Sequence, residues 1–196
     1  LEETIGNYRG VGAPIDTKEP YILISQHPDT LKYLDARAQI SQTLQAILEL
    51  KMQAIWLWPN IDAGSDSISK LLREHRENNQ KSKIHFYRNF SAEDYITILE
   101  NATCIVGNSS SGIREASFLG IPSVNIGERQ SGREKTANVI DVDYSKNEII
   151  QAIINQQLIG KYEKDETYGD GMAGKRMAKI LTQLDLSRLK KNFNFL

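Results

Sequence analysis

The chain has 196 residues, with 24 Lys and Arg against 25 Asp and Glu, so its formal net charge is −1. That balance excludes a strong electrostatic attraction to nucleic acid or to an anionic membrane surface. No apolar run approaches the ~18 residues of a membrane span, and the first residues lack a signal-peptide pattern. One cysteine, Cys104, excludes an internal disulfide. A reducing cytoplasm is the simplest compartment.

Short apolar runs alternate with amphipathic stretches along the chain. The sequence predicts six strands, at 21–25, 54–58, 84–87, 103–107, 122–126 and 138–142. Between them it predicts helices, within 30–50 and over 65–78, 91–101, 111–119 and 145–158. Ser91, with Asp94 three residues on, is the expected N-cap of one of these helices. This alternation predicts an α/β fold, a Rossmann-like doubly wound parallel sheet.

The two ends of the chain differ from this middle part. The Gly-rich stretch 1–19 is expected to be an interdomain linker, and 20–185 to be one domain. Asp170 is expected to cap a last helix that carries Met177, Ile180, Leu181 and Leu184. The basic, aromatic segment 186–196 is expected to be a tail that leaves the domain.

Polar, glycine-rich segments follow the predicted strands, where a doubly wound sheet binds its ligands. The sharpest of them is the Gly-Asn-Ser-Ser-Ser-Gly segment at 107–112. Gly107 permits a tight turn, and small hydroxyl residues at a helix N-terminus suit a phosphate or diphosphate. The alternative is that Ser109, Ser110 or Ser111 only caps the helix. A Walker loop is excluded because no Lys follows Gly112.

Three further residues are candidates for ligand contacts. Glu115, expected well inside the helix after the serines, could accept the hydroxyls of a ribose, or could be a solvated charge paired with Arg114. His27 directly follows a strand and could donate to a phosphate or act in acid–base chemistry, or be a loop histidine satisfied by the backbone. Arg129 could clamp an anion together with Arg133, or be paired with its acidic neighbours.

Other conspicuous residues have simpler interpretations. Trp56 and Trp58 alternate on one strand and are expected in the core, as is Cys104. The three histidines have no metal-ligand spacing, so the sequence predicts neither a metal nor another cofactor.

Several segments occur together in one order: QHP, WPNIDAGS, GNSSSGIREASFLGIPSVNIGERQSGRE, NVIDV and YGDG. This set resembles the UDP-N-acetylglucosamine 2-epimerases, and within them the hydrolysing branch of sialic-acid-type sugar biosynthesis. The similarity runs from about residue 5 to residue 185. It implies a glycosyltransferase-B-like enzyme of two Rossmann-like domains, of which this chain matches the C-terminal one.

The resemblance also implies roles for individual residues. His27 would contact the diphosphate and the sugar, and Asn60 would line the cleft. The segment Arg88, Asn89 and Phe90 would meet uracil, chiefly through its backbone. Ser109 and Ser110 would bind the diphosphate, Glu115 the ribose hydroxyls, and Arg129 the cleft rim.

The family's principal catalytic carboxylates lie in the N-terminal domain, which this chain lacks. The chain alone is therefore expected to bind a UDP-sugar without turning it over, and its partner would be the missing domain. A homo-oligomer is one alternative for its assembly, and the exact sugar stays open. Two other functions remain: the donor domain of a glycosyltransferase of the same fold, and a non-catalytic module that binds sugar nucleotides. Release of UDP without an acceptor sugar would indicate an epimerase and not a glycosyltransferase. Whether an N-terminal half is encoded upstream in frame tests the non-catalytic module.

Overall fold

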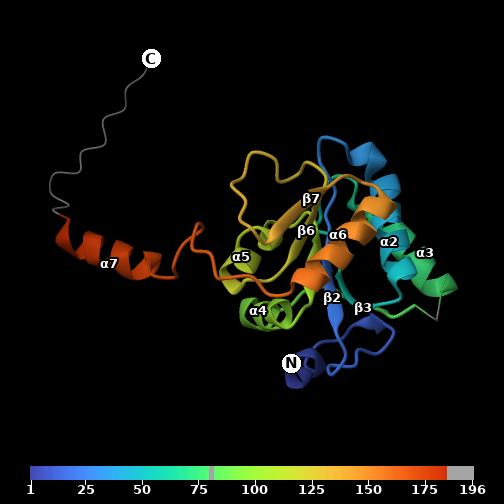
Figure 1. Cartoon of the computed structure of the whole chain (residues 1–196), viewed down its shortest axis with the longest axis horizontal. Helices are drawn as coiled ribbons and strands as arrows, with labels where there is room; N and C mark the ends of the chain where they lie inside the picture. Colours follow the sequence, from blue (N-terminus) through green and yellow to red (C-terminus); the bar gives the residue numbers. More distant parts are fainter. Residues whose placement is uncertain (80–81, 185–196) are drawn as a thin grey trace, which may run out of the picture.

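A seven-stranded sheet forms the centre of the computed structural model, which describes residues 1–79 and 82–184 (Figure 1). Its strand order is β1-β4-β3-β2-β5-β6-β7. Strands β2 to β7 are parallel, and β1 pairs antiparallel with β4 at one edge. The bounds are Val11–Gly12, Tyr21–Ser25, Gln53–Leu57, Ile84–Tyr87, Cys104–Gly107, Ser123–Ile126 and Val139–Val142 for β1 to β7.

Helices cover both faces of this sheet. The structure has α1 (Glu2–Gly6), α2 (Ala36–Leu50), α3 (Ser65–Asn78), α4 (Ala92–Glu100), α5 (Glu115–Leu119), α6 (Lys146–Ile159) and α7 (Ala173–Gln183), with 3-10 turns η1 (Tyr33–Asp35) and η2 (Ser110–Gly112). Helices α2, α3 and α6 contribute to one hydrophobic cluster, and α1, α4 and α5 to the other. The fold is therefore the predicted doubly wound sheet with a helical layer on each side.

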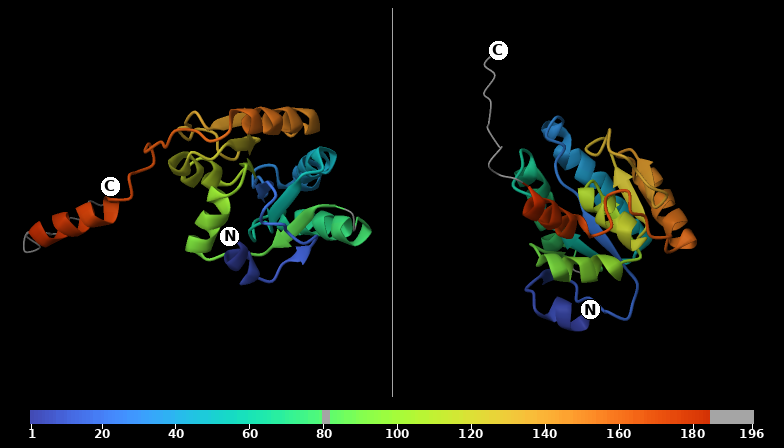
Figure 2. Two further views of the ribbon diagram at one scale, coloured as in Figure 1. Left: turned by 60° about the horizontal axis from the view of Figure 1, so that its bottom comes forward. Right: turned by 90° about the vertical axis from the view of Figure 1, so that its left-hand side faces the viewer.

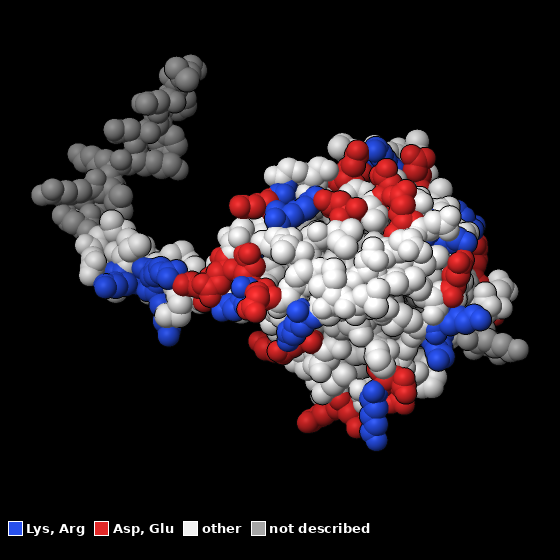
Figure 3. All heavy atoms as spheres, in the orientation of Figure 1, with Lys and Arg blue, Asp and Glu red and all other residues white. Residues whose placement is uncertain are grey.

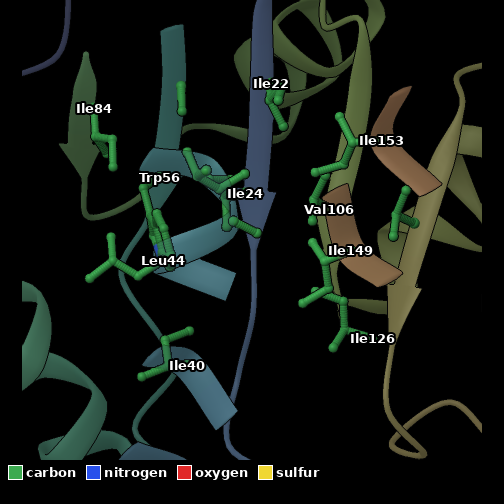
Figure 4. Packing of buried hydrophobic residues seen from close by; sticks show 14 of the residues in the cluster. Ile22, Ile24, Ile40, Leu44, Trp56, Ile84, Val106, Ile126, Ile149 and Ile153 are labelled. Carbon is green, nitrogen blue, oxygen red and sulfur yellow. The ribbon is translucent and has the colours of Figure 1, made fainter. Parts of the chain in front are cut away.

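The central strands explain this double covering. All five residues of β2 are buried, and its side chains alternate between the two clusters. Ile22 and Ile24 face α2 and α6, where they pack in one cluster with Leu44 and Ile149 (Figure 4). Tyr21 and Leu23 belong to the opposite cluster. A strand that is apolar on both faces can be buried only between two layers of helices.

Most predicted elements are confirmed, and for one helix the predicted bounds match the structure at both ends. Helix α3 spans the predicted 65–78. The hydroxyl of Ser91 accepts a hydrogen bond from the Asp94 N–H at 3.2 Å, so the predicted N-cap of α4 is confirmed. The predicted helix at 111–119 is wrong in part, because the chain first forms the 3-10 turn η2 and begins α5 only at Glu115.

The first nineteen residues are more structured than a loop. Leu1, Ile5 and Tyr8 pack against the cluster under α4. The Tyr8 hydroxyl donates to Asp94 Oδ2 at 2.5 Å. This segment is thus part of the folded body, and its function as an interdomain linker stays a prediction.

Helix α7 is the exception to the packed architecture. None of its residues is buried, and it lies away from the sheet in every view (Figures 1 and 2). Its N-cap is Met172, not the predicted Asp170, whose carboxylate instead accepts the Met172 N–H at 2.9 Å and pairs with Arg176. The predicted tail at 186–196 lies outside the described residues.

The surface over α6 is poor in charge. From Ile149 to Gly160 the chain has no charged residue, and Figure 3 shows this stretch as a broad uncharged area with charges around it. Ile154 and Leu158 are exposed there. Within 1–79 and 82–184, no helix has the length and apolar character to cross a membrane.

Candidate functional site

The site lies where the strand order reverses, between β2 and β5. The carboxyl ends of these strands are Ser25 and Gly107, which are register partners. Gly107 has φ +135°, and a Cβ there would lie 2.2 Å from the Ser25 carbonyl oxygen. Only glycine fits this close approach. The chain can therefore turn here and bring the loops after β2 and β5 side by side, at the usual ligand crevice of such a sheet.

Asn108 joins these two loops. Its side-chain Oδ1 accepts the His27 N–H at 2.7 Å, and its Nδ2 donates to the His27 carbonyl at 2.8 Å. Its own carbonyl accepts from Arg129 and from Gln130, at 3.2 and 2.8 Å. Asn108 is fully buried. A buried amide that both donates to and accepts from one residue fixes the position of that residue, so Asn108 holds His27 at the rim.

The imidazole of His27 is held as a neutral donor. The Asn60 N–H donates to Nδ1 at 3.1 Å, which leaves the proton of the neutral ring on Nε2. Burial, and then the nearby Arg129, lower the pKa of His27 from 6.5 to about 4, while Asp62 opposes the shift. Nε2 lies 3.5 Å from the Ser25 hydroxyl. At neutral pH this ring can therefore donate one hydrogen bond from Nε2.

The serine loop after β5 has unused donors. The Ser109 hydroxyl caps η2 by accepting the Ser111 N–H at 3.3 Å, and the Ser111 hydroxyl accepts from Tyr95 at 2.7 Å. Ser110 is half-buried, and neither its N–H nor its hydroxyl is hydrogen-bonded to a described residue. Capping therefore explains Ser109 and leaves Ser110 with two donors for a ligand. Since α5 has only five residues, any anion here depends on these donors more than on a helix dipole.

A cavity of about 490 Å³ brings most of the predicted residues together. It is lined by residues from the loops after β2, β3, β4 and β5, namely His27, Asn60, Arg88, Asn89, Phe90, Ser109, Ser110 and Glu115, with Trp58 and Tyr95 among the others. Arg129 is not among them. It lies beside the cavity, bonded to the Asn108 carbonyl and 3.9 Å from Asp62.

Glu115 stands one turn of chain beyond the serines. It is the first residue of α5, not a residue well inside a helix as the sequence predicts. Among the described residues its carboxylate has no ion pair, so the alternative of a pair with Arg114 is not what the structure has. A half-buried carboxylate without a cationic partner retains its acceptor capacity for hydroxyl groups.

Two aromatic residues and Arg129 lie in or near the cavity in ways that the sequence predicts only in part. The Phe90 ring is buried against Tyr87 and Tyr8, at 4.8 and 4.7 Å between centroids, and Phe90 also lines the cavity. Trp56 is in the core as predicted, but Trp58 is only partly buried and lines the cavity. Arg129 pairs with Asp62, not with Glu128, which instead bonds Lys32 at 2.7 Å.

Sequence reasoning missed the residues that support the site. Asn108 was visible only as part of the Ser-rich segment, and nothing in the sequence shows that its amide reaches across to His27. Tyr95 is a half-buried residue of α4, and its hydrogen bond to Ser111 is a tertiary contact that no local pattern predicts. Burial raises the pKa of Tyr95 to about 12, so it stays a donor.

The fold and this rim define the chain as a Rossmann-like α/β domain with a ligand crevice at the reversal of strand order. The profile of the UDP-N-acetylglucosamine 2-epimerase family matches residues 3–182, and the chain belongs to that family.

Two curated relatives and one solved structure illustrate the similarity. The chain is 30% identical over 171 residues to a UDP-N,N'-diacetylbacillosamine 2-epimerase (hydrolyzing) of Legionella pneumophila, covering 87% of this chain and 45% of that protein. It is 33% identical over 153 residues to a UDP-N-acetylglucosamine 2-epimerase of Neisseria meningitidis, covering 78% and 40%. The Methanocaldococcus jannaschii UDP-GlcNAc 2-epimerase, solved with UDP-GlcNAc and UDP, shares the fold with a TM-score of 0.64 at 20% identity, covering 84% and 46%. The chain thus spans about half the length of these proteins.

Proposed function

We propose that this chain is the UDP-holding half of a hydrolysing UDP-N-acetylglucosamine 2-epimerase. The observation that carries the proposal is the pair of unused donors on Ser110, facing the same cavity as the His27 ring and the unpaired Glu115 carboxylate. These groups match the parts of a nucleoside diphosphate in order: donors for phosphates, then an acceptor for hydroxyls.

In this proposal each cavity residue has one task. The diphosphate lies against Ser109, Ser110 and the Nε2–H of His27. The ribose hydroxyls donate to Glu115. The base lies along the backbone of residues 88–90, where the Phe90 side chain is turned into the core. The sugar extends past Asn60 and Arg129 toward the other half of the enzyme.

The whole enzyme would remove the proton at C2 of UDP-GlcNAc and expel UDP, after which water adds to the glycal and N-acetylmannosamine forms. The electrons of the broken C1–O bond go to the diphosphate, whose added negative charge must be stabilised. Fixed donors at the leaving oxygen supply this stabilisation. The chain's own share of the reaction is therefore to accept UDP as the leaving group.

The remaining half of the enzyme is the partner that this proposal requires. The relatives are about twice as long as the part matched here. Within 1–79 and 82–184, the cavity offers Glu115 as its one carboxylate, which is already assigned to the ribose. The acids that move the C2 proton would come from the missing half.

The test uses the full-length parent protein and UDP-GlcNAc without any acceptor sugar. We expect UDP and N-acetylmannosamine to appear in equal amounts. If UDP appears only after an acceptor sugar is added, the chain is a transferase donor domain and the proposal is wrong. A Ser110→Asp variant should lose turnover. Ser110→Asn, whose side chain has nearly the same size but no charge, is the control and should retain most of the turnover.

A further inference from the structure

A second and larger cavity, of about 880 Å³, lies next to the rim site. Its walls are the N-terminal segment around β1, the loop after β3, and one side of α3. Four arginines line it: Arg9, Arg73, Arg76 and Arg88. In the described part of the chain, no Asp or Glu lines this cavity.

The four positive charges are poorly neutralised. Among the described residues only Arg76 has an ion pair, with Glu77 at 3.6 Å, and the Glu77 side chain is 66% exposed. The guanidinium of Arg73 lies 6.0 Å from the centroid of Trp58, which is a contact between a cation and an aromatic ring and not a neutralising one. Like charges gathered on one hollow raise the local positive potential.

This cavity is distinct from the rim site, although the two are neighbours. They share Trp58, Asn60, Arg88 and Asn89. None of His27, Ser109, Ser110 or Glu115 lines the arginine cavity, and none of Arg9, Arg73 or Arg76 lines the rim cavity. The guanidinium groups of Arg9, Arg73 and Arg76 therefore belong to the larger cavity alone, and Arg88 and Asn89 form the border between the two.

We infer that the arginine cavity is a second binding site, for a small molecule with two or more negative oxyanion groups. Guanidinium groups bind phosphate and carboxylate through paired N–H donors. The volume suits a small metabolite, and the rest of the lining is uncharged, with Ser69 and the amides of Asn60 and Asn89 as further partners.

The positions of the arginines give the bound anion a structural effect. Arg9 belongs to the N-terminal segment, Arg73 and Arg76 to α3, and Arg88 to the loop after β4. One anion held by guanidiniums from these three segments ties them together. It also draws in Arg88, which borders the proposed base position of the rim site.

The test separates the two sites by filling the first. The chain is held in saturating UDP, and inorganic pyrophosphate or citrate is added in a calorimeter, the two probes distinguishing phosphate from carboxylate recognition. We expect one further molecule of at least one probe to bind. The double variant Arg73→Gln, Arg76→Gln should weaken this binding at least about tenfold, since charged hydrogen bonds are lost, and should leave UDP affinity within about twofold.

A double variant on α7, Lys175→Gln and Lys179→Gln, removes the same charge from exposed positions and should bind the probe as the parent does. The inference is overturned if UDP abolishes probe binding, if neither probe binds, or if the arginine and lysine variants behave alike. If UDP itself does not bind, the proposed function fails separately, and probe titrations of the same variants without UDP still decide the second site.

Discussion

The rim site and the arginine cavity are neighbours, but they present different kinds of groups to an anion. The rim site uses N–H and hydroxyl donors and a neutral imidazole, all fixed by the buried Asn108 and the tight approach at Gly107. The arginine cavity uses four guanidiniums, three of them exposed, on long side chains. The donors of the rim site are thus fixed in direction but carry little charge, whereas the side chains of the arginine cavity carry charge but are not fixed in direction.

Because of this difference, the rim site is suited to stabilising a leaving group, and the arginine cavity is suited to binding a free anion. Donors that are already aimed need no reorganisation when charge develops, which is what stabilises a transition state. Exposed guanidiniums attract any multiply charged anion, but salt screens them and each side chain loses rotamer freedom on binding. Under the two proposals, the rim site stabilises the leaving group and the arginine cavity binds a second molecule.

The largest expected effect comes from placing a negative charge in the rim site. Ser110→Asp would set a carboxylate beside the diphosphate, and like charges ~4 Å apart at an effective dielectric of ~20 cost about 4 kcal/mol. UDP affinity should fall roughly a thousandfold. Calorimetric titration measures the affinity, and a thermal melt shows that the fold survives.

The matched control is Ser110→Asn, which has nearly the same size and no charge. It should lose far less affinity than the Asp variant. Equal affinity for UDP in the Asp variant and the parent would show that Ser110 faces no anion.

The next effect concerns pH and His27. Burial lowers the folded pKa of this ring to about 4, against 6.5 in the unfolded chain. As pH falls from 6.5 to 4 the unfolded chain takes up this proton first, so the free energy of unfolding falls, by about 3 kcal/mol at most. His27→Asn should flatten this slope in urea melts at pH 4 to 7. His75, whose pKa burial also lowers, is unchanged in both proteins, so the difference between them reports on His27. An unchanged slope would contradict the buried neutral ring.

Glu115→Ala tests the ribose contact. Losing a charged acceptor for hydroxyl groups should weaken UDP and UMP binding alike, by roughly 1.5–3 kcal/mol. Glu93→Ala, at an exposed position in the first turn of α4, is the control and should change neither affinity. If Glu115→Ala binds both nucleotides as the parent does, the carboxylate is only a surface charge.

The smallest expected effect is a difference between the two sites in how strongly binding depends on salt concentration. Between ~50 and ~300 mM KCl, binding of pyrophosphate in the arginine cavity should weaken several times more than binding of UDP in the rim site, because exposed charges are screened and half-buried donors are not. Parallel calorimetric titrations measure both. Equal salt slopes would mean that the two sites do not differ as described.

The sequence predicted the framework well because the framework follows from local patterns. The buried runs of β2 and β3, the amphipathic α3 and the Ser91 cap each depend on residues close together in the chain. The interruption before Glu115 was not predicted, because the Ser109 hydroxyl caps a 3-10 turn that competes with a continuous helix.

The candidate residues of the rim were predictable and their supports were not. His27 and Ser110 follow strands, and the topology alone brings such residues together. The amide of Asn108 spans 81 positions to reach His27, and Arg9 and Arg73 line one cavity although they lie in segments far apart in the chain. Contacts of this range depend on how the elements pack, which no local pattern encodes.

The most direct measurement of the central claim is a calorimetric titration of UDP into this chain, with and without EDTA. The account predicts saturable binding of one UDP per chain, unaffected by EDTA because the site's donors are N–H, hydroxyl and imidazole groups. A chain that melts cooperatively, and is therefore folded, yet shows no UDP binding at millimolar concentration would contradict it.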